Sequence, residues 1–449
     1  MADEVPTREV SGRVRALGLV TLGLLACAAY VGWLVAQPRG LAEFSYAPFS
    51  PEPLPYSPMR GFTYEQLWGH VARFVLVTPG LVLVTAGLFR LRSLDMPASF
   101  RRLVFGACGF SVAVASLVMF AVLRGRAIVD DELVYRMQAT FLSEGRLGGR
   151  DVGVVPPDVF TIGTLAGYTG KYLPGEAIVQ IPGVLAGMAP FLHLPLLALT
   201  LFAWHRALLL RSGARIAELG TIALAISPMV MLTTATGLSQ STSLCMIVLG
   251  GLGLEWARSS RPLAGAALLA FAVAFGFATR PQSLLPAGAA LVPTAAFALF
   301  RARRYLALAV LTGALALGLA AVGAYNDALS GSPFKLPWYL QCVIEHYGFG
   351  RVWKLDSFEH TPFTALENLA VVAVRLNAWW LGLPCSLAVL VLWLFWGRNA
   401  HGGGVWLLVG LFIVVFELGY YSPGVSETGT AYHYELVLPG SLIVASVLD

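Results

Sequence analysis

The segment PLAGAALLAFAVAFGFATRPQSLLPAGAALVPTAAFALF, residues 262–300, contains one charged residue, Arg280. It holds two apolar stretches, 263–279 and 282–300, and each is close to the ~20 residues that a helix needs to cross the hydrocarbon core of a bilayer. Backbone groups find no water in that core, so a stretch of this kind spans as a helix. The segment therefore predicts two adjacent membrane-spanning helices with a cation at the turn between them.

The same apolar pattern recurs along the whole chain. The protein has 449 residues, of which 57% are hydrophobic and 12% are charged, and its mean hydropathy is +0.72. These values lie far outside those of soluble domains. They predict an all-α polytopic membrane protein with about twelve transmembrane helices, which we place at 16–36, 70–89, 103–123, 195–210, 215–234, 241–257, 263–279, 282–300, 305–324, 378–397, 402–421 and 435–448.

Arginine placement predicts the orientation of the chain in the membrane, because Lys and Arg near helix ends resist translocation. Arginines in five interspan segments fall on one side if the N-terminus is cytoplasmic. The segments near 37–69, 124–194, 325–377 and 422–434 then lie outside. The net charge of +5 follows from this topology, so we expect membrane lipids and no nucleic acid as partners.

The pattern divides the chain into five regions. Two large outer loops each join a polar part to an apolar part that is too short or too interrupted to span, which predicts an amphipathic helix at the membrane surface in each loop. The regions are an N-terminal transmembrane region 1–123, a first outer loop 124–194, a transmembrane core 195–324, a second outer loop 325–377 and C-terminal helices 378–449.

The densest acidic cluster of the sequence is Asp130, Asp131 and Glu132 in the first outer loop. The stretch DELVYRMQATFLSEG, residues 131–145, predicts a helix that ends at Gly145. We expect Asp130 to be its N-cap and Asp131 to project from its polar face, where partial burial would make a carboxylate a better base. A solvated start of a helix is the structural alternative, since acidic residues favour the first turn.

Cations stand at two positions suited to a lipid phosphate. Lys171 and Tyr172 lie in GKYLPGE, residues 170–176, a loop with Gly and Pro turn chemistry. Arg280 lies at the outer end of an apolar stretch, where a cation is costly unless it faces a cavity or an anionic partner. Anchoring at the headgroup level is the alternative for the first pair, and snorkelling is the alternative for Arg280.

A third stretch, TAYHYELVLPG at residues 430–440, precedes the last predicted span and can also be read as an aromatic belt. Helix-end positions explain Glu218, Glu417 and His205, which we leave out. The sequence shows neither a CxxC metal pattern nor a disulfide framework, so no metal ligands are predicted. Asp131 and Glu132 are the candidate catalytic residues, and the candidate substrate-binding residues are Tyr135, Lys171, Tyr172, Arg280, His433, Tyr434 and Glu435.

Taken in order, these motifs resemble the polytopic glycosyltransferases of the C-type superfamily, in the branch of protein O-mannosyltransferases and lipid A aminoarabinose transferases. The resemblance covers roughly residues 125–440. It rests on the DE pair followed by Tyr three residues later, on KYLPG, on an SP and an RP at span ends, and on YHYELVLPG. It implies transfer of a sugar, with inversion, from a polyprenyl-phosphate donor to a lipid, glycan or protein acceptor outside the plasma membrane, the inner membrane in a bacterium.

By position, Asp131 matches the catalytic aspartate of that family, with Glu132 beside it. Lys171 matches a contact to the donor phosphate, and Arg280 is a looser match for the same role. In this chain the acidic loop follows the third predicted span, which implies two additional N-terminal helices, and Ala431 stands where the family commonly has Arg. The acidic cluster has the residue types that bind a divalent cation, but this branch does not generally require one, so we expect no cofactor.

The residues suit this chemistry independently of the resemblance. A lipid-phosphate leaving group needs cations more than a proton donor, whereas the acceptor hydroxyl needs a base. The main alternative is a transporter or a flippase of lipid-linked glycans, which would place its charges near the midplane on broken helices, often in two related halves. A polymerase or ligase of lipid-linked glycans and an inactive scaffold of the same fold are further alternatives.

Overall fold

The computed structural model describes residues 18, 21–26, 28–29, 100–149, 161–259, 261–341, 347–351, 359–382, 386–396, 403–422, 424–426 and 429–449. The predicted span 70–89 lies outside the described residues, as does most of the predicted span 16–36.

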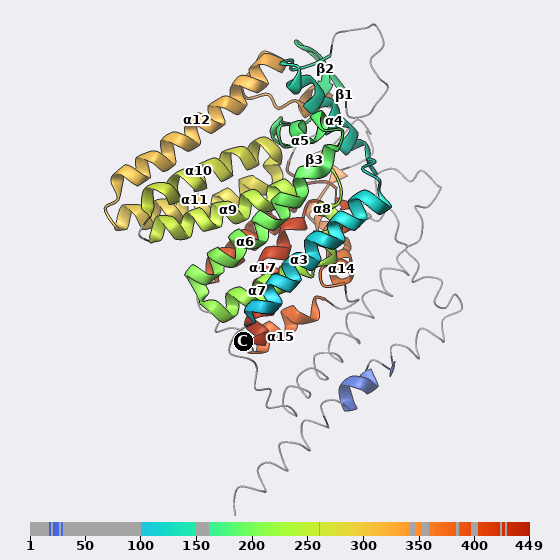
Figure 1. Cartoon of the computed structure of the whole chain (residues 1–449), viewed down its shortest axis with the longest axis vertical. Helices are drawn as coiled ribbons and strands as arrows, with labels where there is room; N and C mark the ends of the chain where they lie inside the picture. Colours follow the sequence, from blue (N-terminus) through green and yellow to red (C-terminus); the bar gives the residue numbers. More distant parts are fainter. Residues whose placement is uncertain are drawn as a thin grey trace, which may run out of the picture.

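The described chain is built almost wholly from helices (Figure 1). Three short antiparallel hairpins pair β1 (Thr161–Thr164) with β2 (Gly167–Gly170), β3 (Gly350–Arg351) with β4 (Glu359–His360), and β5 (Val425–Ser426) with β6 (Gly429–Thr430). The helices are α3 (Arg101–Leu117) with its π-helical extension Val118–Val122, α4 (Asp130–Ser143), α5 (Gly175–Leu185), the 3₁₀ turn Ala189–Leu192, α6 (His193–Ser212), α7 (Ala214–Ala225), α8 (Pro228–Thr234), α9 (Gln240–Arg258), α10 (Pro262–Thr279), α11 (Pro281–Arg301), α12 (Tyr305–Ser330), α13 (Trp338–Gln341), α14 (Pro362–Trp379), α15 (Ala388–Trp396), α16 (Gly404–Glu417), the 3₁₀ turn Tyr434–Leu436 and α17 (Val437–Leu448).

Five described helices are long and apolar enough to cross a membrane, and α7 with α8 makes a sixth candidate that is bent by 58°. The five are Arg101–Val122, Ala189–Ser212, Pro262–Thr279, Pro281–Arg301 and Tyr305–Ser330. The all-α polytopic class is therefore confirmed. The count of about twelve spans, the orientation and the division into five regions stay predictions.

The predicted span 378–397 is wrong as a single helix. α14 ends at Trp379 and α15 begins only at Ala388. The side chain of Asn377 accepts a hydrogen bond from the Leu387 backbone N–H at 3.0 Å, and its backbone carbonyl accepts one from the N–H of Ser386. These two hydrogen bonds join the chain on either side of the break between α14 and α15.

Helices α9 and α10 pack backbone against backbone because two glycines face each other at their contact. A Cβ placed on Gly265 would lie 2.2 Å from the backbone nitrogen of Ala257 and 2.5 Å from the carbonyl oxygen of Gly253. Only a residue without a side chain permits this approach. The buried core continues from this pair, and its largest members include Trp204 on α6 and Trp406 on α16, whose rings meet edge to face at 4.5 Å.

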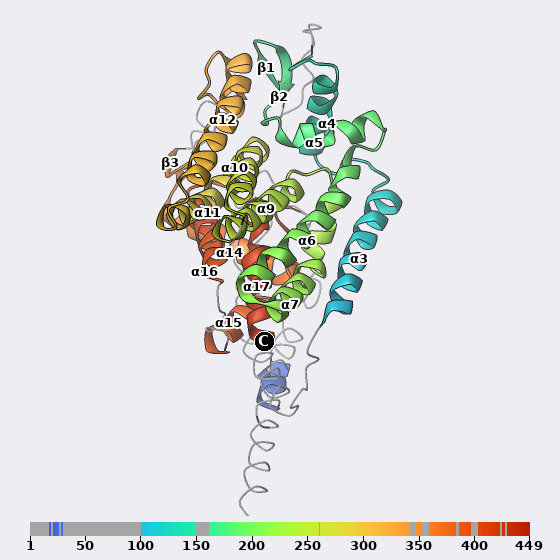
Figure 2. The same cartoon turned by 60° about the vertical axis from the view of Figure 1, so that its left-hand side comes forward.

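Elements α4, α5 and the β1–β2 hairpin gather at one end of the helical bundle, together with one end of α12 (Figure 2). The hairpin tip is tied to α12 by a hydrogen bond from the Leu165 backbone N–H to the Leu329 carbonyl at 3.0 Å. At its other end the hairpin meets α4 at Gly170, where a Cβ would lie 2.3 Å from a methyl carbon of Val134. This end of the bundle, which also holds the junction between α10 and α11, is the one that the sequence assigns to the outside.

We predict that Gly265→Ala destabilises the protein by about 1–3 kcal/mol, because the new methyl group must push two helix backbones apart. The matched control is Gly313→Ala on α12, where nothing lies within 4 Å of the added Cβ. The melting temperature of the purified protein in detergent measures both changes. Equal melting temperatures for the two variants would contradict the close packing of α9 on α10.

Candidate functional site

A pocket opens at the same end of the bundle and encloses about 750 Å³, its open mouth included. We call it the outer pocket. Its walls come from α4, the residues after β2, the start of α9, the α10–α11 junction, α13 and two tyrosine-rich loops. The residues that line it are Asp131, Tyr135, Lys171, Tyr172, Leu173, Ser239, Thr279, Arg280, Pro281, Gln282, Trp338, Tyr339, Tyr347, Tyr420 and Tyr432.

Asp131 stands in the first turn of α4 and faces the outer pocket. Its Oδ1 accepts a hydrogen bond from the Tyr172 hydroxyl at 2.6 Å, and the Tyr172 ring packs on that of Tyr135 with centroids 4.8 Å apart. Burial, and then the negative charge of Asp131, raise the pKa of Tyr172 well above its ordinary value. The Tyr172 hydroxyl therefore keeps its proton and remains a donor to the carboxylate.

The start of α4 differs in one respect from the sequence prediction. The N-cap is Val129, in an extended conformation, and no side chain caps the helix. Asp130 is the first helical residue and is exposed, so its assignment as the N-cap was wrong. Three carboxylates in the first turn still match the positive end of the helix dipole.

Lys171 reaches the outer pocket because the chain after β2 is held against α4. Nε2 of Gln138 donates a hydrogen bond to the Tyr172 carbonyl at 2.8 Å, and Gly170 fits against Val134 only because it lacks a side chain. The Lys171 ammonium lies 5.5 Å from the centre of the Tyr172 ring. A compact cation thus lies over the ring of the tyrosine that contacts Asp131.

Arg280 is the single residue between α10 and α11, and its side chain is only 6% exposed. Its Nε donates to Ser283 Oγ at 3.1 Å, its Nη1 to Ser239 Oγ at 3.3 Å and its Nη2 to the Ala431 carbonyl at 2.8 Å. The guanidinium also lies 5.4 Å from the centre of the Tyr432 ring. Each terminal nitrogen carries a second N–H, and a rigid planar cation of this kind suits a phosphate.

Glu132 does not line the outer pocket, although it follows Asp131 directly. Successive helical residues point about 100° apart, and the Glu132 side chain is fully buried under α4. Its two oxygens accept hydrogen bonds from the backbone N–H groups of Gly237 at 2.7 Å and of Ile128 at 3.1 Å. Its Oε2 also lies 3.8 Å from Nη2 of Arg136, so the structure places this candidate catalytic residue in a buried network away from the pocket.

His433, Tyr434 and Glu435 are likewise buried and do not line the outer pocket. Glu435 lies behind Arg280, with Oε1 4.0 Å from the arginine Nε, and accepts a hydrogen bond from Ser243 at 2.5 Å. Their neighbour Tyr432 does face the pocket. The motif therefore reaches the site through a residue that the sequence prediction did not include.

Sequence reasoning also missed most of the aromatic wall. The Tyr420 ring stacks at a tilt on Tyr347, with centroids 4.9 Å apart, and meets Tyr432 edge to face at 5.0 Å. Trp338 and Tyr339 complete the wall. Their sequence signal is weak. Tyr420 and Tyr432 lie near the ends of predicted spans, where an interfacial belt is the ordinary explanation, and Trp338, Tyr339 and Tyr347 lie within the predicted second outer loop.

The described residues contain no group of three or more His, Cys, Asp or Glu side chains that could hold a metal ion. Asp131 has no carboxylate partner among the residues that line the outer pocket. Its described hydrogen-bond partner there is a tyrosine hydroxyl. The expectation that no cofactor is needed stays a prediction.

Among solved structures, the chain is similar to ArnT from Cupriavidus metallidurans bound to undecaprenyl phosphate, with 15% identity and a TM-score of 0.48 over 76% of this chain and 60% of that one. It is also similar to arabinosyltransferase EmbB from Mycobacterium smegmatis, with 17% identity and a TM-score of 0.45 over 86% of this chain and 34% of that one. The chain spans less than two thirds of the length of either structure. No protein-family model and no curated protein matches the chain.

We predict that His433 makes the protein less stable in acid. Burial lowers the pKa of His433 to about 4, whereas an unfolded chain has a histidine pKa of about 6.5. As the pH falls from about 6.5 to 4, the unfolded state takes up the proton first, so stability is lost through this window and is fully present above it. The drop in melting temperature between pH 7 and pH 4.5 should be larger for the native protein than for His433→Gln. An equal fall in both would contradict the burial of His433.

Proposed function

We propose that the protein is a membrane glycosyltransferase that moves a sugar from a polyprenyl-phosphate-linked donor to a hydroxyl of a lipid, glycan or protein acceptor on the outer side of the plasma membrane. One observation carries the proposal. The Asp131 carboxylate, the Lys171 ammonium and the Arg280 guanidinium line a single pocket. The carboxylate can act as the base for the acceptor hydroxyl, and the two cations can stabilise a phosphate leaving group.

In the proposed reaction, the acceptor oxygen attacks the anomeric carbon of the donor sugar from the face opposite to the phosphate. The bond between that carbon and the phosphate oxygen breaks, and its electron pair leaves with the polyprenyl phosphate. Lys171 and Arg280 offset the negative charge that develops on the phosphate. The proton of the acceptor hydroxyl passes to Asp131.

Tyr172 supports the role of Asp131 as the base. Its hydroxyl holds Oδ1 from one side at 2.6 Å, which orients the carboxylate. A general base must be held within hydrogen-bond reach of the proton that it removes. Because Tyr172 keeps its own proton, it does not compete with the acceptor for the base.

The carboxylates among the described residues of the outer pocket support an inverting mechanism. A retaining mechanism needs a second carboxylate at about 5 Å to form a covalent intermediate. Among the described residues that line the pocket, Asp131 is the only carboxylate, and Glu132 is directed into the protein. A single displacement by the acceptor is therefore the reaction that we propose.

The aromatic wall and the position of the pocket favour a lipid-linked sugar over a transported solute. Aromatic faces such as those of Tyr420 and Tyr432 offer apolar surface with a polar hydroxyl, which suits a carbohydrate ring. Transporters generally hold anionic substrates near the midplane on broken helices. Here the cations lie at one end of the bundle, near α4 and the β1–β2 hairpin.

We predict that Asp131→Asn lowers sugar transfer on the order of a hundredfold or more, because the amide cannot take the proton of the acceptor. Transfer is measured in proteoliposomes as the consumption of a polyprenyl-phosphate-linked sugar. Asp130→Asn is the matched control, since it removes an exposed carboxylate from the adjacent position, and it should retain activity.

Full transfer by Asp131→Asn would remove this residue from the role of base. Movement of the donor across the membrane without its consumption, in both the native protein and the variant, would replace the transferase with a flippase.

A further inference from the structure

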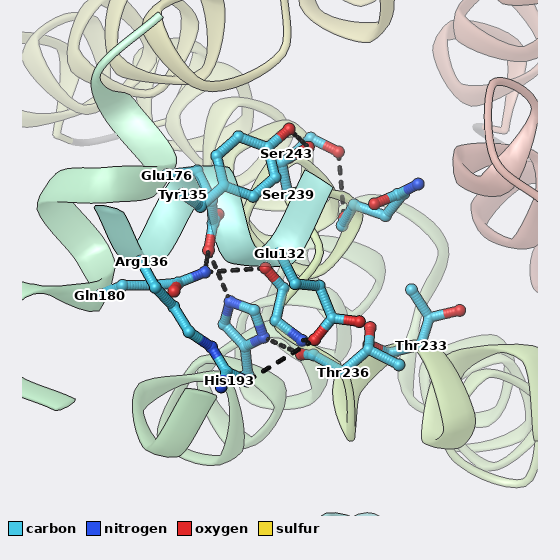
Figure 3. A network of polar contacts seen from close by, with 12 residues as sticks. Glu132, Tyr135, Arg136, Glu176, Gln180, His193, Thr233, Thr236, Ser239 and Ser243 are labelled. Atoms are coloured by element: carbon cyan, nitrogen blue, oxygen red, sulfur yellow. Dashed lines mark hydrogen bonds and ion pairs between the residues drawn. The ribbon is translucent and has the colours of Figure 1, made fainter. Parts of the chain in front are cut away.

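A buried cluster of polar side chains lies beneath α4, outside the outer pocket, and forms hydrogen bonds to one turn of the backbone (Figure 3). The Thr236 carbonyl accepts a hydrogen bond from Nδ1 of His193 at 2.6 Å. The N–H of the same peptide group, on Gly237, donates to Glu132 at 2.7 Å. The next carbonyl, that of Gly237, accepts from Nε2 of Gln180 at 2.7 Å. Side chains from α4, α5 and α6 thus hold two consecutive peptide groups.

Gly237 leaves room in this turn for these hydrogen bonds to form. A Cβ on Gly237 would lie 3.0 Å from Oε2 of Glu132 and 3.5 Å from Nε2 of Gln180. The first distance is tighter than an ordinary van der Waals contact. A side chain at this position would therefore push the α4 carboxylate away from the N–H that it holds.

Glu176 completes the cluster by holding the other side of His193. Because the Thr236 carbonyl can only accept, Nδ1 of His193 carries a hydrogen. Nε2 lies 2.8 Å from Oε1 of Glu176, so one proton must lie between these two atoms. Gln180 donates to the same oxygen at 2.9 Å. Glu176, Gln180 and His193 are fully buried, so each of these partners is needed.

The turn ends at a residue of the outer pocket. Ser239 is 1% exposed, and its hydroxyl oxygen accepts hydrogen bonds from the Tyr135 hydroxyl at 3.1 Å and from Nη1 of Arg280 at 3.3 Å. Ser239 therefore helps to fix the positions of both the Tyr135 hydroxyl and the Arg280 guanidinium. A shift of the Thr236–Gly237 peptide would move the atom to which both are bonded.

We propose that His193 and Glu176, together with Gln180, are positioning residues. They hold the turn from Thr236 to Ser239 and, through Ser239, fix Tyr135 and Arg280 in the outer pocket. The effect on catalysis rests on the proposed function, whereas the hold on the turn does not. None of the three side chains lines the pocket, so each acts through the backbone and not on the substrate.

The test compares His193→Ala with His193→Asn. The alanine variant loses the donor to the Thr236 carbonyl, whereas the asparagine amide nitrogen takes the place of Nδ1 and restores it. We expect hydrogen–deuterium exchange at Gly237 to rise about tenfold in His193→Ala, in line with the loss of one buried hydrogen bond, and to return towards the native rate in His193→Asn. The kcat/KM of sugar transfer should fall and recover in parallel.

The control for simple destabilisation is Glu255→Gln, near the far end of α9. Glu255 is buried and pairs with Arg258 at 2.9 Å. This variant should lower the melting temperature without changing exchange at Gly237 or the kcat/KM. If His193→Ala does not fold, Gln180→Met provides the same comparison, because it removes the donor to the Gly237 carbonyl at nearly constant volume.

A double variant tests whether the effect passes through Ser239. On a Ser239→Ala background, His193→Ala should lower the kcat/KM far less than it does alone, because the link to Tyr135 and Arg280 is already cut. Fully additive losses, or native exchange at Gly237 in folded His193→Ala, would overturn the inference. Exchange that responds as expected in a protein without sugar transfer would instead retain the inference for the turn and remove the proposed function.

Discussion

Burial of the Arg280 guanidinium is the constraint on which the outer end of the molecule depends. A buried cation at the junction of two apolar helices is costly unless it pairs with acceptors and with an anion. The acceptors come from α9 through Ser239, from the loop before α17 through the Ala431 carbonyl, and from Glu435 behind the arginine. Satisfying this one side chain therefore brings together segments that are far apart in the sequence. The same arrangement leaves the arginine facing a pocket that contains Asp131 and Lys171.

The elements that the sequence predicted well are those governed by local rules. The apolar stretches 263–279 and 282–300 correspond to α10 and α11, with Arg280 between them. In a bilayer core without water, a long apolar segment satisfies its backbone hydrogen bonds by forming a helix. The helix from Asp131 that ends before Gly145 was also predicted, since Gly145 adopts the left-handed conformation of a helix end. Asp131, Tyr135, Lys171, Tyr172 and Arg280 line one pocket, and their roles in it stay predictions.

The residues that the sequence could not place depend on contacts across the fold. Glu132 is as acidic as Asp131, and only the approach of the Gly237 N–H shows that it faces inward. His433 and Glu435 lie within three residues of Tyr432, yet of these three only Tyr432 lines the pocket. The span 378–397 was wrong because α14 ends at Trp379 and Gly382 adopts a left-handed conformation that does not continue a helix. A hydropathy average does not detect such a break. Tyr347 and Tyr420 meet only after folding.

We propose that the outer pocket binds a lipid phosphate between its two cations, beside the base. A cryo-EM structure of the protein in a lipid nanodisc with a polyprenyl phosphate tests this directly. The phosphate should lie within hydrogen-bond distance of Lys171 or Arg280, with the Asp131 carboxylate facing the same cavity. A phosphate bound elsewhere in the bundle, with Lys171 and Arg280 unchanged in their contacts, would contradict it.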